Sequence, residues 1–304
     1  MKAAPATPTP RADVYDVITN QIILALENGV TPWKQSWNAA HGAPRNYCSK
    51  HVYQGINAFL LGMLQHEQPY YLTFNQAREL GGCVRKGEKG MPVVFYKVSK
   101  KEDAQGKERK VAILQYSTVF NISQIDGVDW QQPELPRREH TPQQAAEQIL
   151  AGYIDGPRVH YAGSEPHYRT STDTVTVPEA VNFHTPEDFY ATLFHELAHS
   201  TGHAKRLDRA TLTEKASFGS ETYAKEELVA ELGAAFLSNA AGLDLTRTEP
   251  SFAGYLANWL LALRSDKRLI ISAASQAQKA ANYILGCVPS YEVTEAEAVN
   301  EASE

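Results

Sequence analysis

Two histidines with a glutamate between them carry the most specific chemical signal in this sequence. They stand in the segment His195-Glu196-Leu197-Ala198-His199. On a helix, residues i and i+4 share a face, so both imidazoles can reach one metal ion while Glu196 reaches a water molecule bound to that ion. This spacing is typical of zinc-dependent peptidases, in which the glutamate is the general base. The pattern therefore predicts a zinc site with Glu196 as its catalytic residue.

The third metal ligand must come from elsewhere in the chain. In the segment 225–231 (KEELVAE), Glu227 and Glu231 share one helical face and flank an apolar stripe. An E-x-x-x-E pair after HExxH is the arrangement of gluzincins, where the first carboxylate binds metal and the second orients a ligand histidine. We predict Glu227 as the ligand and Glu231 as the residue that orients a histidine, with the choice between the two left open.

Other residues fit the third position less well. Lys205 occupies the place of the last metzincin histidine and cannot bind metal as a cation. His203 could do so only if the helix continued past Gly202. Glu226 points about 100° away from Glu227 on the helix. The donor that would stabilise an oxyanion stays open among Tyr223, His203, Tyr168 and His167, and the strand 173–178 is a candidate edge strand for a peptide substrate.

The elements that must position this site have clear sequence patterns. Thr185 is suited to an N-cap, with Pro186 at the first helical position and acids in the first turn. The patterns predict an α+β protein: a small mixed α/β-sheet N-terminal domain, then a mainly helical zincin-like (gluzincin) domain with a short sheet. We expect helices at 13–27, 57–65, 73–80, 186–202, 222–240, 250–264 and 266–285, and strands at 84–100, 111–123, 157–162 and 173–178.

Charge and proline content divide the chain. Residues 1–130 hold 15 basic and 11 acidic side chains (net +4), whereas the remainder holds 14 and 24 (net -10). Three prolines and several charges interrupt the periodicity between the two parts. The predicted divisions are a flexible arm (1–12), a nucleic-acid-binding domain (13–130), a linker (131–142), a metallopeptidase-like domain (143–290) and an acidic tail (291–304).

The basic half combines cations with aromatic rings, the mixture that suits single-stranded nucleic acid. We expect tighter binding to single strands than to duplex, marked salt dependence, and contacts confined to residues 13–130. The candidate contacts are Trp33, Trp37, Arg45, Tyr47, Lys50, Tyr53, Arg85, Lys86, Lys89, Tyr96 and Lys97.

The three cysteines are widely spaced, and none of them forms a C-x-x-C motif. This pattern favours a protein of a reducing compartment. No secretory signal and no apolar run of roughly 18 residues occurs, so we expect a cytoplasmic protein without membrane partners.

The chain from about Asp13 to Gly286 resembles the plasmid antirestriction family ArdC. The segments TPWKQSW, PRNYCSKHVYQGIN, YLTFNQARELGG and VRKGEKG resemble its single-stranded-DNA-binding domain, which also begins conjugative-plasmid primases. The segments FHELAHSTGH, FGSETYAKEELVAELGAAFL and SDKRLIISAASQAQKAANYIL resemble its zincin-like metallopeptidase domain.

This resemblance implies a protein that binds single-stranded DNA entering by conjugation and protects it from type I restriction. It carries metal binding onto His195, His199 and a carboxylate of EELVAE, and catalysis onto Glu196. Zn²⁺ is the expected metal, with Mn²⁺ as an alternative, and a type I restriction enzyme or another protein is the candidate substrate. The alternative is a DNA-binding protector whose metal domain is structural or an interaction surface.

Overall fold

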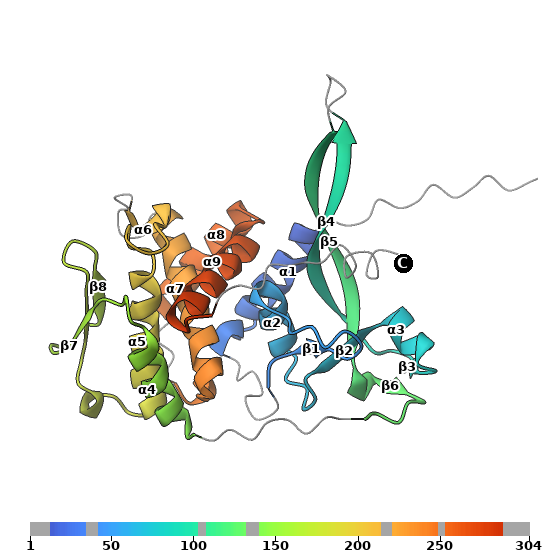
Figure 1. The fold of residues 1–304 in the computed structure, drawn as a ribbon, viewed down its shortest axis with the longest axis horizontal. Coiled ribbons are helices and arrows are strands. Elements are labelled where there is room, and N and C mark those ends of the chain that lie inside the picture. The colour runs from blue at the N-terminus through green and yellow to red at the C-terminus, as the bar shows by residue number, and fades with distance from the viewer. Residues whose placement is uncertain are drawn as a thin grey trace, which may run out of the picture.

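The computed structural model describes residues 13–34, 42–102, 108–131, 140–213, 221–248 and 253–287 (Figure 1). The predicted arm (1–12), most of the predicted linker and the tail (291–304) lie outside these ranges. The fold is mixed α/β, with an N-terminal sheet region followed by a helical region that carries a small sheet, as the sequence predicts. Within the described residues, no helix combines the length and the apolar character needed to cross a membrane.

The N-terminal region is built around a four-stranded sheet of order β1-β2-β5-β4 and a two-stranded pair of β3 and β6. Strands β4 and β5 form a long antiparallel hairpin that projects from the body of the molecule (Figure 1). The elements are α1 (Val14–Glu27), η1 (Pro32–Lys34), β1 (Arg45–Asn46), α2 (Gly55–Gly62), β2 (Tyr70–Thr73), α3 (Phe74–Glu79), β3 (Cys83–Val84), β4 (Met91–Glu102), β5 (Glu108–Asn121), η2 (Ile122–Gln124) and β6 (Ile125–Asp126).

The C-terminal region places a three-stranded sheet beside a helical bundle. Its elements are α4 (Pro142–Gly152), β7 (Arg158–Tyr161), β8 (His167–Arg169), β9 (Thr174–Val177), η3 (Ala180–Asn182), α5 (Pro186–Ser200), α6 (Ala210–Thr213), α7 (Glu221–Ala241), η4 (Leu245–Arg247), α8 (Ala253–Ser265) and α9 (Leu269–Ile284). The sheet order is β7-β9-β8, so β9 is the central strand. The expectation that segment 173–178 forms an edge strand is therefore wrong, because strands from both sides pair with it.

Side-chain caps account for several helix starts. The Asp13 carboxylate accepts a hydrogen bond from the Tyr15 amide at the start of α1. Thr73 and Thr141 each form a reciprocal capping box with a glutamine three residues later, at α3 and α4. These contacts satisfy amides that have no partner within the helix, and each stabilises its helix by about 1 kcal/mol.

One hydrophobic cluster spans both regions of the chain. Helix α1 packs against α8, and α2 packs against α9 (Figure 1). Trp33 is only 1% exposed, and its ring lies edge-on to Trp259 with 5.0 Å between centroids. The Thr19 hydroxyl donates to the Lys267 carbonyl at 2.7 Å. Because the two regions share this cluster, residues of the N-terminal region also help to stabilise the helices that carry the predicted metal ligands.

Candidate metal centre

Helix α5 presents the two histidines of the HExxH segment on one face. The helix begins as predicted: Thr185 caps it by accepting from the Asp188 amide, and Pro186 holds the first position. Its opposite face is anchored in the core by Leu193, Phe194 and Leu197, each at most 1% exposed. A helix fixed in this way places His195 and His199 in a defined orientation toward α7.

Helix α7 crosses close to α5 because one position lacks a side chain. A Cβ atom built on Gly233 would lie only 2.9 Å from the Cβ of Ala198. This separation is shorter than real carbon contacts allow, so any larger residue at position 233 would push the helices apart. The close approach brings Glu227 of α7 over the histidines of α5.

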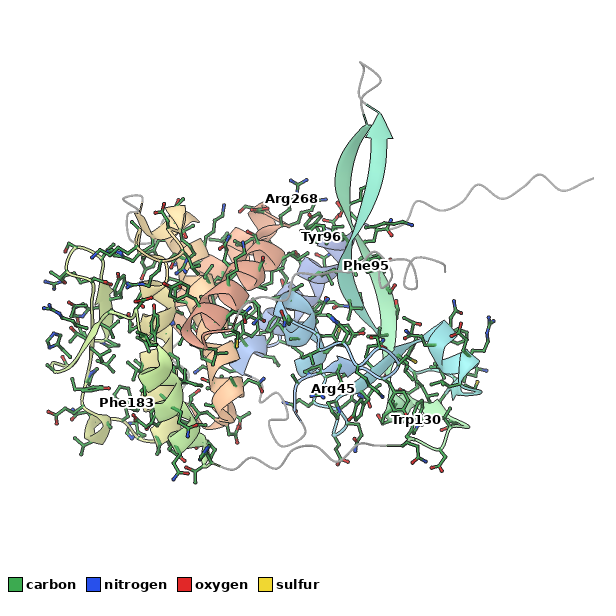
Figure 2. All side chains as sticks on the ribbon, in the orientation of Figure 1. Arg45, Phe95, Tyr96, Trp130, Phe183 and Arg268 are labelled. Carbon is green, nitrogen blue, oxygen red and sulfur yellow. The ribbon has the colours of Figure 1, made fainter. Side chains whose placement is uncertain are left out.

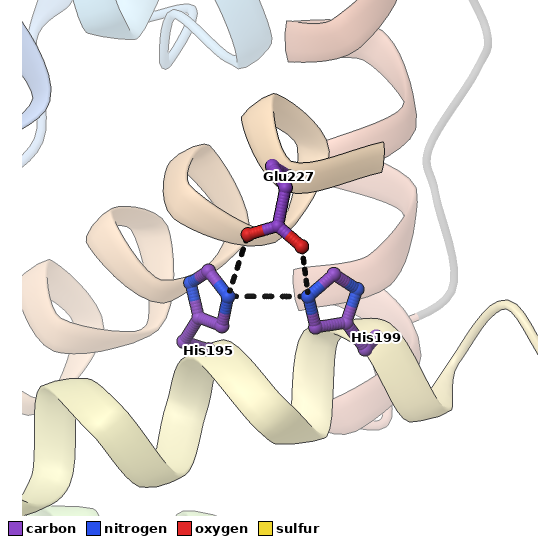
Figure 3. Close-up of side chains that lie close together, drawn as sticks. All are labelled: His195, His199 and Glu227. Atoms are coloured by element: carbon purple, nitrogen blue, oxygen red, sulfur yellow. Dashed lines mark hydrogen bonds and ion pairs between the residues drawn. The ribbon is translucent and has the colours of Figure 1, made fainter. Parts of the chain in front are cut away.

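The three predicted ligands converge on one point (Figure 3). The Nε2 atoms of His195 and His199 lie 3.1 Å apart. The Glu227 carboxylate places one oxygen 3.5 Å from Nε2 of His195 and the other 3.6 Å from Nε2 of His199. All three donor atoms lie within 4.8 Å of one another.

The outward-facing nitrogen of each histidine contacts a further carboxylate. The Nδ1 atom of His195 lies 3.4 Å from Oε1 of Glu231, and Nδ1 of His199 lies 3.2 Å from Oε1 of Glu226. A carboxylate at Nδ1 favours a proton on that nitrogen and leaves the Nε2 lone pair free for a metal. Both Nε2 lone pairs then face each other and the Glu227 carboxylate, an arrangement that a divalent cation stabilises. The donor set therefore fits a metal ion.

Glu226 is part of a buried network that the sequence pattern does not predict. Its side chain is enclosed, with the residue 4% exposed, and it accepts hydrogen bonds from Arg209 and Thr211. Arg209 also donates to the Ala198 carbonyl of α5 at 2.9 Å. Helical spacing disfavours Glu226 as a metal ligand. Its position directly before Glu227, on a helix that is buried on several sides, nevertheless indicates that it lies near the site. Nothing in the sequence pattern pointed to Arg209.

The charges of the site shift the pKa values of its acids and bases. Burial raises the pKa of Glu226, but His199 and Arg209 outweigh it and lower the pKa to about 2. Burial likewise raises the pKa of Glu227, and contacts with His195, His199 and Tyr223 lower it below its usual value. Burial lowers the pKa of His195, whereas Glu227 and Glu231 raise it well above its usual value. Glu226 and Glu227 are thus held ionised, whereas His195 must release its additional proton when a metal binds.

The metal ligands open into a cavity of about 830 Å³. Glu196 lines this cavity one residue from His195 and is 7% exposed. Trp33 and Lys34, from the N-terminal region, also line it. Burial lowers the pKa of Lys34, although the nearby Glu231 and Asp188 act in the opposite direction. The cavity wall is therefore built by both regions of the chain.

The structure separates the four candidates for the oxyanion donor. Tyr223 lines the cavity and hydrogen-bonds Glu227. Tyr168 and His167 also line it, but the Tyr168 hydroxyl donates to Asp173 at 2.9 Å. His203 is not among the lining residues, and its Nδ1 accepts from the Lys205 amide.

The candidate DNA contacts fall into different environments. Trp33 and Tyr53 are 1% and 4% exposed, so their rings belong to the core and cannot stack on bases. Their assignment as DNA contacts is wrong for the described conformation, because both rings are buried in the hydrophobic cluster instead of being exposed on the surface. Trp37 lies outside the described residues.

The remaining candidates occupy two places on the N-terminal region. The Tyr47 ring lies edge-on to Trp130, and the Lys50 ammonium lies 4.2 Å from the Tyr47 centroid. Tyr96, 55% exposed, lies on the hairpin, while Arg45 and Trp130 lie toward the other end of the sheet (Figure 2). Arg85, Lys86 and Lys89 are exposed, whereas Arg45 and Lys97 are partly buried. Arg85 is paired with Glu88 and Asp126, which reduces the charge it offers a phosphate.

Two family profiles match the chain in the order that the fold suggests. Residues 12–120 match the N-terminal domain of anti-restriction factor ArdC, and residues 144–276 match a zincin-like metallopeptidase. The fold and site thus define a protein in which an ArdC-type N-terminal domain is followed along the chain by a zincin-like metallopeptidase domain.

Similar proteins extend this result over nearly the whole chain. An uncharacterized protein y4eC of Sinorhizobium fredii is 37% identical, over 92% of this chain and 93% of its own length. Two Escherichia coli proteins called DNA primase TraC are each 34% identical, and the chain spans 20% and 27% of their lengths. Crystal structures of antirestriction ArdC from plasmid R388, one metal-free and one Mn(II)-bound, are 34% identical with TM-scores of 0.71, and the match covers 98% and 100% of those chains and 95% and 92% of this one.

The chain belongs to the ArdC antirestriction family. Its His195, His199 and Glu227 side chains form a cluster that can hold a divalent metal ion, and one of the similar crystal structures is Mn(II)-bound.

Proposed function

We propose that this protein binds single-stranded DNA entering by conjugation and protects it from type I restriction, and that its metal site is a zinc-dependent peptidase centre. The observation that carries the peptidase part is the convergence of His195, His199 and Glu227 within 4.8 Å, with Glu196 adjacent in the same cavity. Two histidines and one carboxylate are the ligand set of catalytic zinc sites, which leave a position open for water.

The residues of the chain would divide the chemistry among them. A bound Zn²⁺ would supply an acidified water molecule and polarise a peptide carbonyl. Glu196 would accept a proton from that water and donate one to the leaving amine. Glu231 and Glu226 would hold the two imidazoles in place through Nδ1. Tyr223 fits the oxyanion donor best, since it lines the cavity and its hydroxyl is within reach of the Glu227 carboxylate.

Substitution of the general base tests the peptidase proposal. In Glu196→Gln, we expect unchanged metal content and a loss of peptide hydrolysis by a factor of at least about 10². Glu179→Gln, an exposed substitution outside the cavity, is the matched control. Hydrolysis by Glu196→Gln equal to that of the control would remove Glu196 from its role.

DNA binding by the N-terminal region rests on its exposed cations and on the Tyr47–Lys50 cluster. We expect a Lys50→Glu, Lys86→Glu double variant of the full chain to bind a labelled oligo-dT more weakly and with a shallower salt dependence, because two phosphate contacts are lost. Lys205→Glu, an exposed change in the other region, is the control. Equal oligo-dT affinity in both variants would contradict this surface.

A second candidate function keeps DNA protection but assigns the metal domain a structural or protein-interaction role. The buried anchoring of both histidines is compatible with such a role. The position of Glu196 in the cavity favours the peptidase, because a structural metal needs no general base. Antirestriction activity that survives Glu196→Gln but not Glu227→Gln would favour the structural role.

A further inference from the structure

The outer face of the three-stranded sheet carries a cluster of basic side chains. In the strand register, Arg158 of β7 and Arg169 of β8 both pair with Thr174 of the central strand β9. One row further along, His160 and His167 both pair with Thr176. Directly paired residues point to the same side of a sheet, as do residues two positions apart. We call these six residues the basic sheet face.

This face points away from the core. The alternate positions Val175 and Val177 are fully buried, and Val159 and Tyr168 pack against the same hydrophobic cluster. By contrast, both arginines and both histidines of the basic sheet face are exposed. Except for Tyr161, which is 49% exposed, the alternate positions pack beside α5, and the other side of the sheet is open.

The arginines of this face are not neutralised by neighbouring acids. Within the described residues, the guanidinium groups of Arg158 and Arg169 make no ion pair or hydrogen bond. Only two acids lie between positions 157 and 177. Asp173 is bound by Arg206, and Glu165 lies in the loop that precedes β8.

The basic sheet face adjoins the metal cavity. His167, Tyr168 and Thr170 belong both to the β8 region and to the cavity wall. In the described sheet, β8 pairs with β9 on one side only, so its other edge is free. An extended polypeptide can add to a free strand edge through its backbone, and its alternate side chains then lie over one face of the sheet.

We propose that the basic sheet face binds an acidic stretch of polypeptide and directs the adjoining residues into the metal cavity. Charge complementarity and the shared wall at His167 favour this occupant. The basic sheet face carries no Phe, Tyr or Trp ring on which bases could stack, and its only aromatic groups are the two smaller imidazoles, which favours a polypeptide over single-stranded DNA. For cleavage this inference rests on the proposed peptidase function, whereas binding does not depend on it.

Fluorescence anisotropy with the full-length Glu196→Gln protein tests this surface. The probe is a labelled ten-residue peptide of alternating Glu and Thr, and its matched partner replaces every Glu by Gln. We expect the acidic peptide to bind more tightly, and an Arg158→Ala, Arg169→Ala double variant to weaken it about three- to tenfold. Arg268→Ala, Lys279→Ala removes two exposed cations outside both proposed binding surfaces and should leave this affinity unchanged.

The outcomes separate this inference from the proposed function. Equal binding of the two peptides, or no effect of the Arg158 and Arg169 changes, would overturn the inference. A loss of oligo-dT binding in that double variant, with peptide binding retained, would also overturn it and assign the face to nucleic acid. Selective binding of the acidic peptide without its cleavage by the wild-type protein would support the surface and count against the peptidase.

Discussion

The Nδ1 atom of His199 lies 3.2 Å from Oε1 of Glu226, whose other contacts are the guanidinium of Arg209 and the hydroxyl of Thr211. A predicted metal ligand is thereby connected to a buried ion pair at the end of α5. Arg209 is 5% exposed and also binds the carbonyl of Ala198, so the network fixes His199 relative to both α5 and α7.

Glu226→Gln should weaken metal binding. Glutamine keeps the size of the side chain but removes the charge that favours a proton on Nδ1 of His199, and changes of this kind cost about 10- to 100-fold in metal affinity. Competition with a chromogenic chelator measures this affinity. The control is Glu179→Gln, and an affinity equal to that of the control would show that Glu226 does not position His199.

Glu227→Gln and Glu231→Gln should differ in metal content. Glu227 faces both Nε2 atoms, whereas Glu231 contacts only Nδ1 of His195. We therefore expect Glu227→Gln to lose the metal and Glu231→Gln to retain part of it at reduced affinity. Elemental analysis after dialysis measures both variants, and the reverse ranking would make Glu231 the ligand.

Trp33→Ala should destabilise the whole chain. The ring packs between Phe59 and Trp259, so its removal leaves a cavity in the shared core at a cost of about 3 to 5 kcal/mol. Denaturant unfolding measures the change. Tyr96→Ala, which removes an exposed ring, should change the free energy of unfolding by less than about 0.5 kcal/mol. Similar losses in the two variants would contradict the shared core.

Asp173→Asn should reduce stability near neutral pH and alter its acid dependence. Burial raises the pKa of Asp173, but Arg206 and Tyr168 lower it below its usual value. A carboxyl whose folded pKa is depressed contributes stability above its unfolded pKa of about 3.9, and this contribution is lost as the pH falls through the lower folded value. We expect a loss of about 2 kcal/mol at pH 7, and this loss should shrink as the pH falls below about 4 and vanish once the pH lies below the folded pKa of Asp173. A loss independent of pH would exclude the ion pair as its cause.

The local elements of this protein follow directly from the sequence. The Thr185 cap and the apolar spacing predict several of the helices, because helix formation depends on neighbours within one turn. The same periodicity places His195 and His199 on one face, and Glu227 and Glu231 on another. The sequence segments that resemble the ArdC family also indicate the family to which the chain belongs.

Contacts between elements required the tertiary structure. Helical spacing says which residues share a face, but not how two helices cross, which here depends on the contact between Gly233 and Ala198. Glu226 and Glu227 point in different directions on the helical wheel. Because α7 is buried on several sides, both directions face other parts of the protein, and Glu226 contacts His199. A period of two likewise predicts a strand at 173–178 without indicating which strands flank it.

The sequence alone determined the metal-binding motif, the helices that carry it, and the division of charge between the two halves. Only the tertiary structure decided that Trp33 is a core residue, that Glu226 and Arg209 support a metal ligand, and that arginines from β7 and β8 form one face. The physical reason is that sequence periodicity records the exposure of each element separately. Packing between distant segments decides which side chains meet.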